Sequence, residues 1–219
     1  MDKILRPFTG TGAVCFPIGK PPYGTCEFAS EKCLKSCCAK GDFEYDEELH
    51  ITHEEKAIIY KTVMKAEPIK WLVEEICSEL DGLQTNILYW FGSGDCKTKD
   101  IARVSDIIRL IPSSIVQMGF TRNVKLWEQY KMIFALTLES ETEIGGREGL
   151  FAIPNYKTRT THMRLKTHHR EGYQGFGCGA AWVSLDGVDK KRIKHYANCR
   201  TCYRLKFGCF DTDRKDLMK

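Results

Sequence analysis

Four cysteines lie within thirteen positions near the start of this 219-residue chain, in the stretch GTCEFASEKCLKSCCAKG. In a reducing compartment, thiols grouped this densely hold metal more often than they pair with one another. Cys26, Cys33 and Cys37 are spaced to ligate one centre, whereas Cys38 points elsewhere because neighbouring side chains diverge in any regular backbone. Three thiolates leave one iron of a [4Fe–4S] cluster open, so this loop would be able to bind and activate a small molecule.

The same loop has an alternative interpretation. If Cys38 or Cys15 supplies a fourth thiolate, the loop forms a closed zinc site, because structural zinc is normally bound by four protein ligands. We choose Cys37 over Cys38 as the third cluster ligand because it keeps three residues between itself and Cys33.

A second group of cysteines lies near the end of the chain and comprises Cys178, Cys199, Cys202 and Cys209. The two-residue gap between Cys199 and Cys202 lets both sulfurs face one ion, and the other two complete four-coordination. This pattern suits Zn²⁺ and a second [4Fe–4S] cluster equally well. Of the remaining cysteines, Cys77 shares the apolar face of a predicted helix, so we expect it to pack in the core.

The net charge of +4 conceals an asymmetry along the chain. Residues 151–219 contain 15 Lys and Arg against 6 Asp and Glu, a balance of +9, which leaves residues 1–150 at −5. A basic segment beside an acidic one indicates an anionic ligand such as a nucleotide or nucleic acid. Alternatively, part of this positive charge offsets a thiolate-ligated metal centre, since four thiolates outweigh a divalent ion.

Hydrophobic periodicity predicts the elements that would position these groups. Residues 52–83 read as two helices that begin at a Thr52–Glu55 capping box and break at Pro68. Further along, predicted strands alternate with predicted helices, and this order is typical of βαβ units around a parallel sheet. The strands are 86–96, 113–123 and 134–143, and the helices between them are 98–111 and 124–133. A shorter apolar run, 13–16, would form an opening strand.

The predicted strands end in small, polar and charged residues. Parallel sheets place their ligands at the carboxyl ends of the strands. Here those ends are 92–95 (Gly-Ser-Gly-Asp), 121–123 (Thr-Arg-Asn) and 139–141 (Glu-Ser-Glu). We expect these side chains to lie on one edge of the sheet and to form a binding site there.

Two parts of the chain are expected: an α/β domain at 1–150 and a basic segment at 151–219 that binds metal or a cluster through its four cysteines. No stretch approaches the roughly 20 consecutive apolar residues that a membrane span needs. The N-terminal sequence MDKILRPFTGTG also lacks the apolar run of a secretory signal. We therefore expect a cytoplasmic protein with no membrane partner.

Several of these motifs together resemble a known family. The cysteine loop is preceded by CFPIGK and followed by AKG, and two later strands end in GSGD and FTRN. This combination resembles the phage-associated gene product 88 family, itself similar to radical S-adenosylmethionine (SAM) enzymes, over roughly residues 10–140. The loop spacings here, six and three residues, are wider than the three and two of the usual radical SAM loop.

The resemblance implies a fold, a reaction and a set of contacts. The fold would be a partial (β/α) barrel of radical-SAM type with an appended cysteine-rich C-terminal segment. Cys26, Cys33 and Cys37 would hold a [4Fe–4S] cluster whose open iron is chelated by SAM, and an external electron donor would supply the electron for reductive cleavage. The SAM-binding residues would be Ser93, Gly94, Asp95, Thr121 and Arg122, with the Asp95 carboxylate near the SAM amino group. A phage-encoded chain would act in the host cytoplasm.

Two functions follow as hypotheses. The first is an iron–sulfur enzyme of radical SAM type that modifies a substrate by radical chemistry, with a nucleotide or nucleic-acid base as the candidate substrate. The second is a non-enzymatic nucleic-acid-binding protein stapled by two zinc ions. Zinc-stapled modules are usually small and do not need a parallel sheet with a polar rim, so we favour the enzyme.

Overall fold

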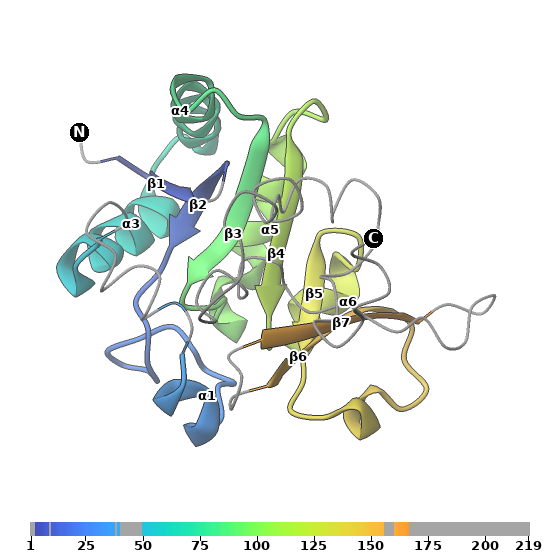
Figure 1. Ribbon diagram of the computed structural model, residues 1–219. Coiled ribbons are helices and arrows are strands. Elements are labelled where there is room, and N and C mark those ends of the chain that lie inside the picture. Colours follow the sequence, from blue (N-terminus) through green and yellow to red (C-terminus); the bar gives the residue numbers. More distant parts are fainter. Residues whose placement is uncertain (1–2, 9, 38, 40–49, 156–159, 167–219) are drawn as a thin grey trace, which may run out of the picture.

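The computed structural model describes residues 3–8, 10–37, 39, 50–155 and 160–166, and shows an α/β fold built on one mixed seven-stranded sheet (Figure 1). The strands stand in chain order, and β2 to β6 run parallel while β1 and β7 pair antiparallel at the two ends. Among the described strands β1 and β7 do not pair with each other, so the sheet is open. The strands are β1 (Leu5–Phe8), β2 (Thr11–Cys15), β3 (Ile87–Ser93), β4 (Val116–Thr121), β5 (Phe134–Thr137), β6 (Gly149–Asn155) and β7 (Thr160–Lys166).

Helices connect the parallel strands, as the alternation in the sequence predicts. They are α1 (Glu31–Lys35), α3 (His53–Lys65), α4 (Ile69–Gly82), α5 (Ile101–Leu110) and α6 (Val124–Gln129). In Figure 1, α3 and α4 lie on the β1–β2 side, α5 lies behind β3 and β4, and α1 lies beyond the arrowheads of β2 and β3. The short cysteine-bearing helix α1 therefore lies at the carboxyl edge of the sheet.

The parallel strands are buried along most of their length. All five residues of β2 are buried, as are five of the seven in β3, a pattern typical of parallel strands covered on both faces. The largest fully buried side chains include Trp90, Trp127, Phe16 and Phe134. This core fixes the strand ends in place and so fixes the polar residues that follow them.

The structure confirms the two helices predicted over residues 52–83, which are α3 and α4. Thr52 accepts a hydrogen bond from the Glu55 backbone N–H at 3.1 Å, and the Glu55 carboxylate accepts one from the Thr52 N–H at 2.7 Å, which completes the predicted capping box. Pro68 is the N-cap of α4, so the break falls where it was predicted. In α4, Cys77 packs half-buried against the core, as its position on the apolar face indicates.

Several elements differ from the sequence prediction, and the predicted helix 124–133, for example, ends at Gln129. The opening strand is a β1–β2 pair, with β1 preceding the predicted run. The third predicted strand, 134–143, ends at Thr137, and Glu141–Ile144 form a 3-10 turn, because the polar run after Leu138 bonds to itself through Ser140 and Glu143. Regular structure also continues beyond Gly146, where none was predicted.

The strands β6 and β7 carry the sheet past residue 150. Residues 167–219, which contain all four cysteines of the second group, lie outside the described residues, so the division at 150 stays a prediction. Within the described ranges, no helix combines the length and hydropathy that crossing a bilayer requires.

Candidate functional site

The carboxyl ends of β3 and β4 meet at Asp95. Its carboxylate accepts hydrogen bonds from the Thr121 hydroxyl at 2.6 Å, the Cys96 backbone N–H at 2.7 Å and the Arg122 backbone N–H at 2.8 Å. The side chain is buried, and burial raises the pKa of Asp95 to about 6 although these hydrogen bonds oppose the rise. Asp95 therefore ties two strand ends together.

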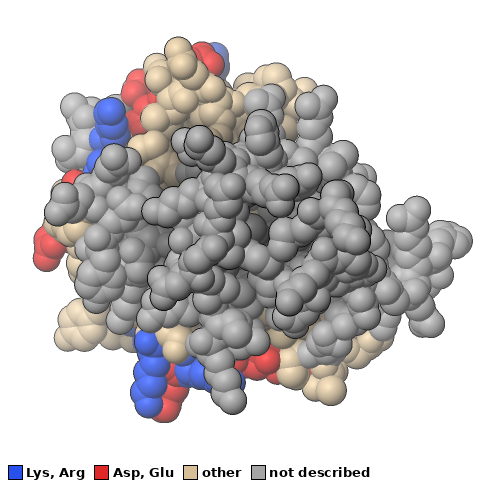
Figure 2. Space-filling model, viewed as in Figure 1, with Lys and Arg blue, Asp and Glu red and all other residues tan. Residues whose placement is uncertain are grey.

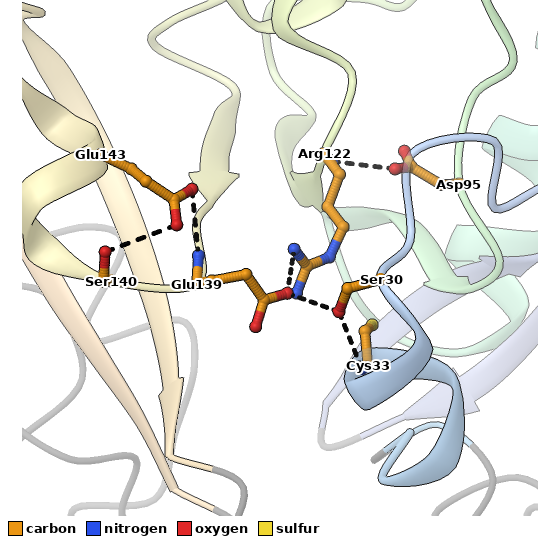
Figure 3. Close-up of polar contacts among 7 residues, drawn as sticks. All are labelled: Ser30, Cys33, Asp95, Arg122, Glu139, Ser140 and Glu143. Carbon is orange, nitrogen blue, oxygen red and sulfur yellow. Dashed lines mark hydrogen bonds and ion pairs between the residues drawn. The ribbon is translucent and has the colours of Figure 1, made fainter.

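The side chain of Arg122 extends that connection to the end of β5. Its guanidinium forms an ion pair with the Glu139 carboxylate at 2.8 Å, and Figure 3 shows the two side chains meeting between the strand ends and α1. Only 11% of the Arg122 side chain and 29% of the Glu139 side chain are exposed, so solvent screens this pair less than it would a surface pair. The three predicted strand ends thus form one polar edge.

The cysteine loop is attached to this edge beside its first cysteine. The Thr25 hydroxyl donates to the Pro17 carbonyl and accepts the Asp95 backbone N–H, both at 3.0 Å. The Cys26 backbone N–H bonds to the Gly19 carbonyl at 2.8 Å. Gly24 allows this tight turn, because a Cβ atom there would lie 2.2 Å from the Gly19 carbonyl oxygen.

A second attachment lies beside the second cysteine. Ser30 is the N-cap of α1, and its hydroxyl accepts the Cys33 backbone N–H at 3.0 Å. The same hydroxyl donates to the Glu139 carboxylate at 2.7 Å (Figure 3). The loop that contains the three predicted cluster ligands is therefore bonded at two points, Thr25 and Ser30, to the carboxyl edge of the parallel sheet.

The three thiols are half-buried. Burial is the main cause that raises the pKa of Cys26 to about 12, and the nearby Asp95 carboxylate acts in the same direction. A thiol with this pKa is a poor nucleophile at neutral pH, because only the thiolate reacts. A bound cation would reverse this trend, since a coordinating thiol loses its proton.

The donor set that the described loop offers is three cysteine thiols. Within the described ranges, no three histidine, cysteine, aspartate or glutamate side chains converge closely enough to hold one metal ion. In a [4Fe–4S] cluster each thiolate binds a different iron, so the sulfurs stand farther apart than the ligands of one Zn²⁺. Cys15, the described candidate for a fourth zinc ligand, is buried in β2 and hydrogen-bonded with Ser93, whereas Cys38 lies outside the described residues.

The structure brings the predicted SAM-binding residues together, and their polar groups already bind one another or the adjoining backbone. The Ser93 hydroxyl is buried and donates to the Phe16 carbonyl at 2.8 Å. The Thr121 hydroxyl donates to Asp95 and accepts the Asn123 backbone N–H at 3.0 Å. Gly94 packs against Phe16 and Thr25. Asp95 keeps about one of the four acceptor positions of a carboxylate, since three donors occupy the others.

Sequence reasoning missed two residues of this site, Thr25 and Ser30. Both lie in the cysteine loop and are bonded to residues more than 65 positions away in the chain. Ser30 had a detectable local signal, because serine is a favoured N-cap and Cys33 follows it by three residues. Thr25 had none that we can identify.

Comparisons with known proteins give no relative for this chain. No protein-family model matches it, and neither a curated protein nor a solved structure does.

Proposed function

We propose that this chain is an iron–sulfur enzyme of radical SAM type, with a partial (β/α) barrel and a [4Fe–4S] cluster held by Cys26, Cys33 and Cys37. The single observation that supports this proposal most is the double attachment of the cysteine loop, through Thr25 and Ser30, to the carboxyl edge of a parallel sheet. Folds of this kind bind their ligands at that edge. A three-thiolate loop fixed there would present its open position to a ligand at the strand ends.

The chemistry divides between the cofactors and the chain. When held by Cys26, Cys33 and Cys37, a [4Fe–4S] cluster would supply the electron for reductive cleavage of SAM and so would start radical chemistry on the substrate. The chain holds the loop against the strand ends through a buried contact of Thr25 with the Asp95 backbone N–H and a part-buried contact of Ser30 with Glu139. Asp95 keeps about one acceptor position, which would accept one hydrogen bond from the SAM amino group.

The candidate substrate is a nucleotide or a nucleic-acid base, and an external donor would supply the electron. The support for this substrate class is the +9 balance of residues 151–219, most of which lie outside the described residues. In the view of Figure 2, described basic and acidic side chains lie side by side at the lower edge and at the upper left. That mixed charge supplies no further support for an anionic substrate.

Production of 5′-deoxyadenosine tests the proposal. The full chain, purified and reconstituted with iron and sulfide under anaerobic conditions, is incubated with SAM and dithionite, and the product is quantified by liquid chromatography. We expect 5′-deoxyadenosine from the wild-type chain, none from Cys33→Ala, and wild-type amounts from Cys77→Ala, which removes a half-buried thiol on α4. Equal product from Cys33→Ala and wild type would overturn the ligand assignment, and a wild-type chain that binds zinc and makes no product would support the zinc-stapled alternative.

A further inference from the structure

The helix that carries Cys33 has little of its own to hold it in place. α1 contains five residues, fewer than an isolated helix needs to be stable in water, and none of them is buried. Core packing therefore does not fix its position. The hydrogen bonds at the N-terminus of α1 are therefore the contacts that can fix its position.

Those contacts run through three side chains to the end of β4. The Ser30 hydroxyl accepts the Cys33 backbone N–H at 3.0 Å and donates to the Glu139 carboxylate at 2.7 Å. Glu139 in turn pairs with the Arg122 guanidinium at 2.8 Å, and the Arg122 backbone N–H bonds to the buried Asp95 carboxylate at 2.8 Å. We call Ser30, Glu139 and Arg122 the Ser30 relay. Figure 3 shows Cys33 on the same side of α1 as Ser30, next to this relay.

We propose that the Ser30 relay positions the Cys33 thiol, and that Ser30 and Glu139 are positioning residues for the cluster site. The serine hydroxyl acts twice, as a helix cap and as a donor to a charged acceptor, and a hydrogen bond to a charged group is about twice as strong as a neutral one. The role toward the cluster rests on the proposed function. The placement of the thiol is a property of the chain itself and is tested without iron.

Substitutions at Ser30 separate capping from the relay. Ser30→Thr keeps both the cap and the donor hydroxyl. Ser30→Asp keeps a good N-cap but sets a carboxylate against that of Glu139, so only the relay is broken. Ser30→Ala removes both contacts. Thr52→Ala, which removes the cap of α3, controls for general loss of stability.

Two substitutions at the β5 end of the relay provide an independent test of the proposal. Glu139→Gln keeps an acceptor oxygen for Ser30 but removes the negative charge that Arg122 and Ser30 share. Glu143→Gln is the matched control, because Glu143 lies beside Glu139 in Figure 3 but is not a member of the relay. The Glu143 carboxylate accepts hydrogen bonds of 3.4 Å from the Glu139 backbone N–H and from the Ser140 hydroxyl.

The measurement is the rate at which iodoacetamide alkylates Cys33 in the iron-free full chain, followed by mass spectrometry of the Cys33 peptide, with Cys77 as the internal reference. We expect Ser30→Ala, which loses the cap as well as the relay, to raise the rate about fivefold, the factor that corresponds to losing about 1 kcal/mol of stabilisation at the helix end. Ser30→Asp, which keeps the cap and loses the relay alone, should raise it about twofold. Glu139→Gln should raise it about twofold, whereas Ser30→Thr, Thr52→Ala and Glu143→Gln should leave it unchanged. Wild-type rates in Ser30→Asp and Glu139→Gln would overturn the proposal, since Ser30 would then act as a helix cap alone.

A second readout connects the relay to the cluster. After anaerobic reconstitution, Ser30→Asp should hold less iron per chain than wild type and show a changed cluster absorption spectrum, and Ser30→Thr should restore both. If the wild-type chain holds no iron, the proposed function fails, while the alkylation rates still decide whether the relay positions Cys33.

Discussion

Among single residues, Asp95 has the clearest structural role. Its carboxylate receives three hydrogen bonds from two strand ends, and its own backbone N–H bonds to Thr25 beside Cys26. The sequence predicted a ligand contact at this position. The structure shows that most of its hydrogen-bonding capacity is used within the protein, so Asp95 contributes first to the integrity of the site.

Replacing Asp95 by asparagine should therefore destabilise the fold. The asparagine amide would place an N–H₂ group where the carboxylate now accepts a hydrogen bond, so two donors would face each other. A buried donor without an acceptor costs about 1–3 kcal/mol. Urea denaturation at pH 7 measures this loss. Asp106→Asn is the control, because Asp106 forms only an exposed 3.8 Å contact with Arg109, and its free energy of unfolding should stay within about 0.5 kcal/mol of wild type.

The raised pKa of Asp95 also predicts a pH dependence. Burial moves the pKa from 3.8 to about 6 in the folded chain, so between these values the folded state binds a proton that the unfolded state has released. Stability contributed by this group is therefore lost as pH rises from 4 to 6, by on the order of 3 kcal/mol. The difference in unfolding free energy between wild type and Asp95→Asn should shrink by this amount between pH 4 and pH 7. A constant difference across that range would contradict the assigned pKa.

Among the structural elements, the turn after β3 positions the site. Gly94 has a φ of +73°, and a Cβ atom there would lie 2.6 Å from the Thr25 hydroxyl and 2.8 Å from the Phe16 carbonyl oxygen. The cysteine loop can approach the strand end this closely only because residue 94 has no side chain.

We expect Gly94→Ala to destabilise the chain by about 3 kcal/mol, the combined effect of a left-handed backbone and overpacking. We expect Gly82→Ala to have the opposite effect. Gly82 is the last residue of α4, and a Cβ atom there would have no heavy atom within 4 Å, so alanine should stabilise the helix by about 0.5–1 kcal/mol. Chemical denaturation of both variants measures the difference. A neutral Gly94→Ala would show that the loop does not need this close approach.

The elements also show how far sequence reasoning reaches. β3 and β4 were predictable because each is an apolar run that ends in polar turn residues, and the same endings located Asp95 and Arg122. β7 was not, because its sequence TTHMRLK is polar and basic and gains its order by pairing with β6. The bonds from Ser30 and Thr25 were likewise unpredictable, since they join segments that only the folded sheet brings together.

For the whole molecule, the described residues form an open, mixed α/β sheet whose carboxyl edge holds a three-cysteine loop. This arrangement combines a predicted cluster loop with the edge at which such sheets bind ligands. The second cysteine group lies outside the described residues, so metal binding by this group stays a prediction.

The central claim is that the N-terminal loop holds a [4Fe–4S] cluster through three thiolates. The most direct test measures iron, acid-labile sulfide and zinc in the anaerobically purified full chain. The second cysteine group is removed by replacing Cys178, Cys199, Cys202 and Cys209 with serine, so that this group does not contribute to the measured metal. We predict about four iron and four sulfide per chain, lost on the further change Cys33→Ala and retained with Cys38→Ala. One zinc ion per chain without sulfide, lost equally in both variants, would contradict the claim.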